Sequence, residues 1–212
     1  MRLDSAGLPF IGGAFALALV SGAAIGWVLA IPFAALGLFF TFFFRDPERR
    51  VVAVTNQVLS PADGRVLVAG PALADAAPPP ASGGAWQQVS IFLSPMDVHV
   101  NRIPASGRVT RVDYKPGRFL PAYHADAAAA NERSEIWIDL DGQMIVARQI
   151  VGILARRVVC RATVGSVVQA GDRYGIMKFG SRMDIFLPAS ATIAVTVGEV
   201  VRGGETVIAV LH

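Results

Sequence analysis

Two stretches of the same form decide the fold class of this chain. Residues 164–172 read VGSVVQAGD, and residues 197–205 repeat the pattern as VGEVVRGGE. The glycines of such a pattern supply the positive φ that tight turns between short strands require. We therefore expect two similar β-hairpins that pack together as a small β-sandwich, or as a flattened barrel of the barrel-sandwich-hybrid kind.

The rest of the sequence from residue 51 onward also favours β-structure. Short apolar runs with a period of two residues or less lie at residues 89–93, 136–140 and 193–197, and Gly, Pro or Asp-Gly separates them. Two segments, residues 72–84 and 115–133, are rich in Ala with Pro or Gly and are expected to be loops. The sequence predicts a mainly β domain over residues 51–212.

The N-terminal region is strongly apolar. Residues 8–44 contain no charged side chain, whereas a single helix needs only about 20 residues to cross a bilayer. This length favours two helical passes or a hairpin, and a signal peptide would have a shorter apolar core. The Arg-rich residues 45–50 mark the cytoplasmic side of a span. We expect a hydrophobic anchor over residues 1–50 in the inner cell membrane and a cytoplasmic domain after it.

The composition supports membrane association and argues against other partners. Hydrophobic residues make up 53% of the chain and charged residues 17%, compared with about 25% charged residues in a typical soluble domain. The net charge of +3 comes without a basic run interleaved with aromatics, so no nucleic-acid partner is expected. One cysteine and three histidines exclude an internal disulfide and make a metal site unexpected.

A candidate nucleophile lies between the two repeats, where residues 178–184 read KFGSRMD. An ordinary β-turn accounts for a Gly-Ser pair at such a place. The chemical alternative is that the Ser181 hydroxyl attacks the carbonyl of Gly180, because glycine has no Cβ to hinder the approach. The amide would then become an ester.

Two further segments contain groups suited to proton transfer. Residues 60–66 read SPADGRV, and residues 94–104 read SPMDVHVNRIP. Asp63 belongs to an Asp-Gly turn pair, and it can also act together with a histidine. His99 and His124 are candidate acids or bases near neutral pH, although either can be structural.

Together, four motifs resemble the phosphatidylserine decarboxylases, most closely their short bacterial and archaeal form. They are SPADGRV, SPMDVHVNRIP, Tyr123-His124 ahead of NER at 131–133, and FGS at 179–181. The resemblance covers the chain from about residue 45 to its end. It implies a carboxy-lyase of phospholipid biosynthesis that converts phosphatidylserine in the membrane into phosphatidylethanolamine.

The resemblance also implies a zymogen that cleaves itself between Gly180 and Ser181. The long chain 1–180 and the short chain 181–212 would remain associated, and a homo-oligomer stays open. Ser181 would become a covalent pyruvoyl group, which binds the substrate amine and acts as an electron sink in place of PLP, without a metal. His99 is the residue we expect to return the proton.

One departure from the family concerns the base. Longer members carry H-x-x-H where this chain has His99 and, three residues later, Arg102; their second histidine pairs with an aspartate to activate the serine. Three alternatives therefore remain: His99 with Asp63, His124 with Asp63, or a different activation of Ser181. The residue after the nucleophile is also changed, from threonine to Arg182.

A rival interpretation comes from a different class of protein. Repeated V-G-x-V-V patterns occur in biotinyl and lipoyl carrier domains, and Lys178 after Met177 is similar to their attachment lysine. This interpretation leaves Asp63 and His99 without a role. A structural β-domain of an export system would need long helical arms, which the sequence does not show. Other pyruvoyl enzymes act on soluble amino acids, and the membrane anchor favours a lipid instead.

Overall fold

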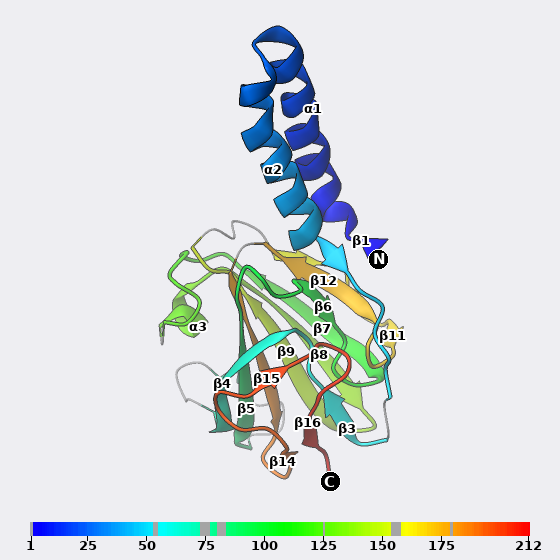
Figure 1. Ribbon diagram of the computed structural model, residues 1–212. Coiled ribbons are helices and arrows are strands. Elements are labelled where there is room, and N and C mark those ends of the chain that lie inside the picture. The colour runs from blue at the N-terminus through cyan, green and yellow to red at the C-terminus, as the bar shows by residue number, and fades with distance from the viewer. Residues whose placement is uncertain are drawn as a thin grey trace. The chain divides into compact units, whose positions relative to one another are not determined.

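The structure is a computed structural model that describes residues 2–52, 55–72, 77–79, 84–124, 126–153, 158–178 and 180–212. The chain divides into two compact units, residues 1–48 and 49–212, and Figure 1 shows the elements of each. The first unit contains the apolar helices and the second contains the β-structure.

The first unit is a helical hairpin. A short 3-10 helix, η1 (Ser5–Gly7), leads into α1 (Leu8–Ala24), and α2 (Trp27–Phe43) runs back beside it. Close packing between the helices depends on missing side chains: a Cβ at Gly37 would lie 2.9 Å from the ring of Phe15. Strands β1 (Arg2–Leu3) and β2 (Arg45–Asp46) pair, so both ends of the hairpin lie together.

The helices present apolar side chains outward. The helical segment Ser5–Ala24 is long and apolar enough to cross a membrane, and α2 is apolar but shorter. Large apolar residues on both helices are more than half exposed, among them Leu8, Leu17, Leu19, Val20, Trp27, Val28, Ile31 and Leu38. An apolar surface of this extent is typical of contact with lipid or with another protein.

The second unit is mainly β, which confirms the predicted fold class. Its largest sheet has eight strands, in the spatial order β11 (Val167–Val168), β7 (Gly107–Lys115), β8 (Arg133–Leu140), β9 (Gln143–Ile150), β13 (Ser181–Pro188), β5 (Trp86–Leu93), β4 (Gly64–Pro71) and β15 (Val200–Val201). Two three-stranded sheets complete it: β10 (Val158–Cys160), β12 (Arg173–Met177) and β6 (Val100–Arg102); and β14 (Thr192–Ile193), β16 (Val207–Val210) and β3 (Gln57–Leu59).

Alternation along the strands separates an inner from an outer face of the large sheet. Met183, Ile185 and Leu187 of β13 belong to the main core, whereas Phe186 packs with Trp86 and Trp137 in a second cluster. The main core therefore defines the inner face of β13, on which every second residue points inward.

The β unit is built from two copies of one motif. Strands β6 to β12 follow each other along the chain and have the same spatial arrangement as β3, β4, β5, β13, β14, β15 and β16. We call the first set the inserted copy and the second the split copy, because the chain leaves the split copy after β5 and returns to it at β13. The two copies meet where β9 pairs with β13.

Matched hydrogen bonds establish which residues are equivalent. Leu59 N donates to Pro104 O and Arg102 N donates to Pro61 O, both at 2.8 Å. Three further bonds of the split copy have a counterpart in the inserted copy. Val66 N donates to Glu199 O as Val109 N donates to Ser166 O, and Gly204 N donates to Ser60 O as Gly171 N donates to Ile103 O. In the third pair, Leu211 N donates to Asn56 O as Met177 N donates to His99 O. The two copies also share one sequence, since residues 61–66 read PADGRV and residues 104–109 read PASGRV.

Two expectations about local structure differ from what the structure shows. The V-G-x-V-V repeats are not hairpins, because β11 pairs with β7 and β15 pairs with β4, at opposite edges of the sheet; each two-residue strand is paired with the PAxGRV segment of its own copy. The run at residues 193–197 is a strand only at β14, since Glu199 N donates to Thr196 O and closes a turn there.

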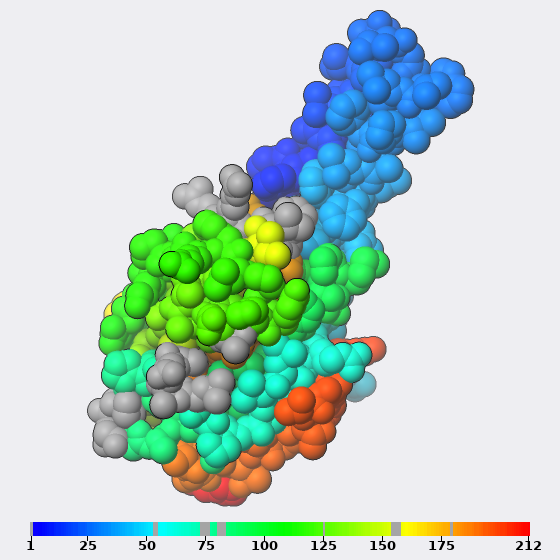
Figure 2. All heavy atoms as spheres, turned by 90° about the vertical axis from the view of Figure 1, so that its left-hand side faces the viewer, coloured from blue at the N-terminus to red at the C-terminus, as the bar shows by residue number. Residues whose placement is uncertain are grey.

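The glycines that the two repeats share, Gly165 and Gly171 in one and Gly198 and Gly204 in the other, do have positive φ, as expected. The loop expected at residues 115–133 spans 116–132 between β7 and β8 and contains α3 (Ala127–Ala130). Figure 2, which faces the side where α3 lies in Figure 1, shows this green segment as a large part of that surface. The expected loop at 72–84 falls partly outside the described residues.

Candidate active site

Ser181 is the first residue of β13, an interior strand of the large sheet. It lies opposite Leu93 of β5, and the next residue, Arg182, lies between Phe92 of β5 and Ile150 of β9. Ser181 is fully buried, and its Oγ has no hydrogen-bond partner among the described residues. Buried hydroxyls are nearly always hydrogen-bonded, so one that is not requires an explanation in terms of function.

The carbonyl of Gly180 lies in a tightly packed place. Gly180 has φ +72°, a left-handed conformation that favours glycine, as the chain turns into β13. A Cβ at Gly152 would lie 2.0 Å from the Gly180 carbonyl oxygen, so any side chain at position 152 would displace that oxygen. Phe179, the first residue of the predicted cleavage motif, lies outside the described residues.

Two of the other predicted motifs make contacts with the strands next to β13 in space or in sequence. Gly64, next to Asp63, packs against the carbonyl of Phe92, because a Cβ there would lie 2.1 Å from that oxygen. The carbonyl of His99 accepts a hydrogen bond from Met177 N at 3.3 Å. Segments that are far apart in the sequence therefore contact β5, which pairs with β13, and β12, which precedes it along the chain.

His99 is buried, and its ring orientation can be inferred. Nδ1 lies 3.0 Å from the carbonyl oxygen of Asp97. A carbonyl oxygen can only accept, so Nδ1 carries the hydrogen and Nε2 has the lone pair in the neutral ring. This tautomer can take up a proton at Nε2.

Asp63 makes two different contacts. Its Oδ1 accepts a hydrogen bond from Gly203 N at 2.8 Å, and its Oδ2 lies 2.6 Å from Nη2 of Arg49. The equivalent of Asp63 in the inserted copy is Ser106, whose hydroxyl accepts from Ala170 N at 3.0 Å. The bond to Gly203 is thus a turn feature common to both copies, whereas the ion pair with Arg49 distinguishes Asp63.

Among the described residues, the side-chain hydrogen bonds of Arg102 and His124 do not involve the Ser181 hydroxyl. Arg102 points to the opposite face of β6 from Asn101, and its Nη1 donates to Gly171 O at 3.0 Å. The side chain of His124 is 55% exposed and its Nδ1 lies 3.7 Å from Asp126. Within the described part of the chain, no hydrogen bond or ion pair connects His124 with Ser181.

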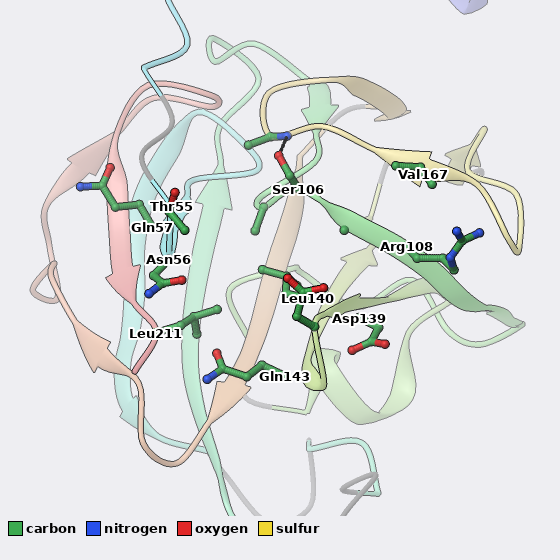
Figure 3. A pocket seen from close by; sticks show the side chains of 14 residues that line it. Thr55, Asn56, Gln57, Ser106, Arg108, Asp139, Leu140, Gln143, Val167 and Leu211 are labelled. Carbon is green, nitrogen blue, oxygen red and sulfur yellow. Dashed lines mark hydrogen bonds between the residues drawn. The ribbon is translucent and has the colours of Figure 1, made fainter.

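The equivalent place in the inserted copy has a different character. Gln143, the counterpart of Ser181, is half-buried and follows the exposed turn residue Gly142. It borders an open cavity of about 710 Å³, shown in Figure 3 with the hydrogen bond to Ser106 as a dashed line. The labelled residues around the cavity include Asn56, Ser106, Leu140, Gln143 and Leu211, which correspond to His99, Asp63, Leu93, Ser181 and Met177.

Sequence reasoning did not identify Gly152 or Arg49 as parts of this region. The signal that could have found the duplication is the second PAxGRV segment at residues 104–109. Aligning it with residues 61–66 separates what the fold needs in both copies from what only one copy has. Gly152 has no comparable signal, because only its contact with Gly180 shows why it is glycine.

Comparison with known proteins agrees with this geometry. The model of the family described as phosphatidylserine decarboxylase matches residues 36–209. A phosphatidylserine decarboxylase proenzyme of Granulibacter bethesdensis is 45% identical over 206 residues, which cover 95% of this chain and 82% of the relative. One of Nitrosomonas europaea is 40% identical over 207 residues, covering 97% and 94%.

This chain belongs to the phosphatidylserine decarboxylase family. The expected enzyme class, a carboxy-lyase, is thereby confirmed. The match of the phosphatidylserine decarboxylase model includes Asp63, His99, Gly180 and Ser181. The carrier-domain interpretation with Lys178 as the attachment site is not supported.

Proposed function

We propose that this chain is a proenzyme that cleaves itself between Gly180 and Ser181 and then decarboxylates phosphatidylserine to phosphatidylethanolamine. The observation that supports this most is the buried Ser181 hydroxyl, which has no partner among the described residues and is next to a carbonyl that lies against Gly152. The names of the relatives, which are phosphatidylserine decarboxylase proenzymes, support the same activity.

The reactants of self-cleavage are the Ser181 hydroxyl, the Gly180 carbonyl and water. The Ser181 Oγ attacks the Gly180 carbonyl carbon, the C–N bond breaks, and an ester replaces the amide. Removal of the Cα proton of Ser181 then breaks the Cβ–O bond and releases the Gly180 carboxylate. Water replaces the nitrogen, ammonia leaves, and the new N-terminus of the short chain is a pyruvoyl group.

The proton transfers require a base near Ser181. His99 is the strongest candidate because it is buried, has the lone pair of its neutral tautomer at Nε2, and accepts a backbone hydrogen bond from Met177. Asp63 lies in the same region but is paired with Arg49, and His124 is exposed. We assign the base to His99, with Asp63 and His124 as the alternatives to be tested.

The surroundings of Ser181 fit a pyruvoyl group. After cleavage, β13 stays hydrogen-bonded to β5 and β9 on its two sides, so the short chain 181–212 keeps its place among the strands of the split copy. The buried position of residue 181 limits the access of bulk water to a reactive ketone. When formed, that ketone supplies the electron sink for loss of the carboxyl group, and the scheme needs neither PLP nor a metal.

We place the enzyme at the inner cell membrane, with the β unit on the cytoplasmic side. The helical hairpin brings both of its ends together through the pairing of β1 with β2, and Arg2, Arg45, Arg49 and Arg50 flank those ends. Arginines next to a span favour the cytoplasmic side. A lipid substrate presents its headgroup at that surface.

The test is the intact mass of the purified full-length protein, measured beside a Ser181→Ala variant and followed by an assay on phosphatidylserine vesicles. We expect the unmodified protein to consist of two chains that are separated after Gly180, the short one with no free N-terminal amine. We also expect it to release carbon dioxide from phosphatidylserine. The variant should remain one chain and be inactive. A single uncut and inactive chain in both samples would refute the proposal, and cleavage without lipid turnover would refute the substrate.

A further inference from the structure

A buried pair of amides lies in the inserted copy. Gln149 Nε2 donates a hydrogen bond to Asn101 Oδ1 at 2.8 Å, and both side chains are fully buried. Their other ends, Asn101 Nδ2 and Gln149 Oε1, have no hydrogen-bond partner in the described part of the structure. Buried polar atoms without partners destabilise a fold, so the pair requires a reason other than stability.

The pair faces the same interior as Ser181. Gln149 of β9 lies directly opposite Met183 of β13, and Ser181, two residues before Met183, points to the same side. Diagonal neighbours of this kind have Cα atoms about 7–8 Å apart, within reach of a long side chain. Ser181 Oγ, which is also buried without a partner among the described residues, is therefore accessible to the amide of Gln149.

The split copy shows that the fold does not need these amides. Val58 takes the place of Asn101 there and Leu187 takes the place of Gln149, and both are fully buried in the main core. The backbone is adapted as well: a Cβ at Gly175 would lie 2.7 Å from Gln149 Nε2, whereas the residue equivalent to Gly175 is Ala209. Space for the amide exists in the inserted copy alone.

We propose that Asn101 and Gln149 are positioning residues for self-cleavage at Ser181. Gln149 Oε1 and Ser181 Oγ are not hydrogen-bonded to each other in the described structure; in the reacting arrangement the Gln149 side chain turns so that Oε1 accepts the hydrogen of the Ser181 hydroxyl and directs an Oγ lone pair toward the Gly180 carbonyl. Asn101 holds Gln149 in this orientation through the hydrogen bond between the two amides. The inference rests on the proposed function, because it assigns a role in the cleavage reaction.

The matched variant gives the inserted copy the apolar residues that the split copy has at the equivalent positions: Asn101→Val together with Gln149→Leu. Full-length chains are synthesised in a cell-free system with phospholipid nanodiscs, and the short chain is followed by gel over time. We expect a thermal unfolding midpoint at or above that of the wild type, because both partners become apolar. Self-cleavage should be at least about tenfold slower.

A second variant, Gln149→Glu, separates positioning from packing. It retains an acceptor oxygen for the Ser181 hydroxyl, and the Asn101 amide can turn so that Nδ2 donates to the carboxylate. Cleavage should therefore recover relative to the double variant and become faster as the carboxyl ionises with rising pH. Wild-type cleavage rates in the folded double variant would overturn the inference. A lowered unfolding midpoint with no recovery in Gln149→Glu would also overturn it, in favour of a structural role.

The failure of the proposed function would look different. If the wild-type chain stays intact beside Ser181→Ala under the same conditions, self-cleavage itself is refuted, and this inference with it. If the wild type is cleaved and the double variant is cleaved equally fast, only the role of Asn101 and Gln149 is refuted.

Discussion

Two equivalent turns in the β unit have different surroundings. In the inserted copy, β8 joins β9 through Asp141 and Gly142, and Gln143 begins the second strand beside an open cavity. In the split copy the same connection is open: β5 ends at Leu93, the whole inserted copy follows, and the chain returns through Gly180 to Ser181 at the start of β13. The Gly180–Ser181 peptide is thus the place where one copy joins the other.

This difference explains why cleavage is compatible with the fold there. Cutting a tight hairpin such as Asp141–Gly142 frees two neighbouring ends at a surface. At Gly180–Ser181 the flanking segments belong to different strands, β12 and β13, which are held by separate partners. Ser181 lies in an interior strand, with Leu93 opposite it on β5, so the two chains of the proposed cleavage would keep their geometry.

The largest expected effect comes from breaking the contact that holds the Gly180 carbonyl. Gly152→Ala places a Cβ 2.0 Å from that oxygen, and a backbone shift of this kind costs about 1–3 kcal/mol. We expect self-cleavage to slow by about 10- to 100-fold, measured by the rate at which the short chain appears. The matched control is Ser190→Ala, at the exposed position that follows β13 as Gly152 follows β9; equal rates for both variants would contradict the assignment.

The second effect distinguishes the shared turn bond from the ion pair at Asp63. Asp63→Ser copies Ser106, so it keeps an acceptor for Gly203 N but leaves the mostly buried Arg49 without its closest carboxylate. We expect the free energy of unfolding to fall by about 2 kcal/mol, compared with about 1 kcal/mol for Ser106→Ala. Urea unfolding of full-length chains in detergent, in the uncut Ser181→Ala background, provides the measurement. Equal losses would mean that the Arg49 pair contributes nothing.

The smallest expected effect is the pH dependence of the free energy of unfolding. It compares Tyr174 with Ile208, which occupies the equivalent core position in the split copy. Burial raises the pKa of the Tyr174 hydroxyl well above its ordinary value, with the nearby Cys160 adding to the shift. In the folded state Tyr174 therefore keeps its proton at a pH at which the unfolded chain has lost it. The difference leaves the free energy of unfolding unchanged below pH 10 and lowers it above pH 10, by about 1.4 kcal/mol per pH unit.

Tyr174→Phe should remove this loss, so that the unfolding free energies of the variant and the wild type diverge only above pH 10. Unfolding curves between pH 8 and pH 11 measure the difference, and Ile208→Val, which does not titrate, is the control. A constant difference between Tyr174→Phe and the wild type across that range would contradict the prediction.

The sequence alone predicted the class of the β unit, which the structure confirms, and the apolar helical segment, because turn chemistry and apolar period are local properties of a chain. The site residues Asp63, His99, Gly180 and Ser181 also come from short local motifs, and their roles stay predictions. Only the tertiary structure decided how the repeats pair, since strands β11 and β15 find partners in PAxGRV segments far from them in sequence. It likewise showed that Arg49 holds Asp63, that Gly152 accommodates the Gly180 carbonyl, and that Gln149 lies diagonal to Ser181. These relations depend on contacts across strands, which no local pattern encodes.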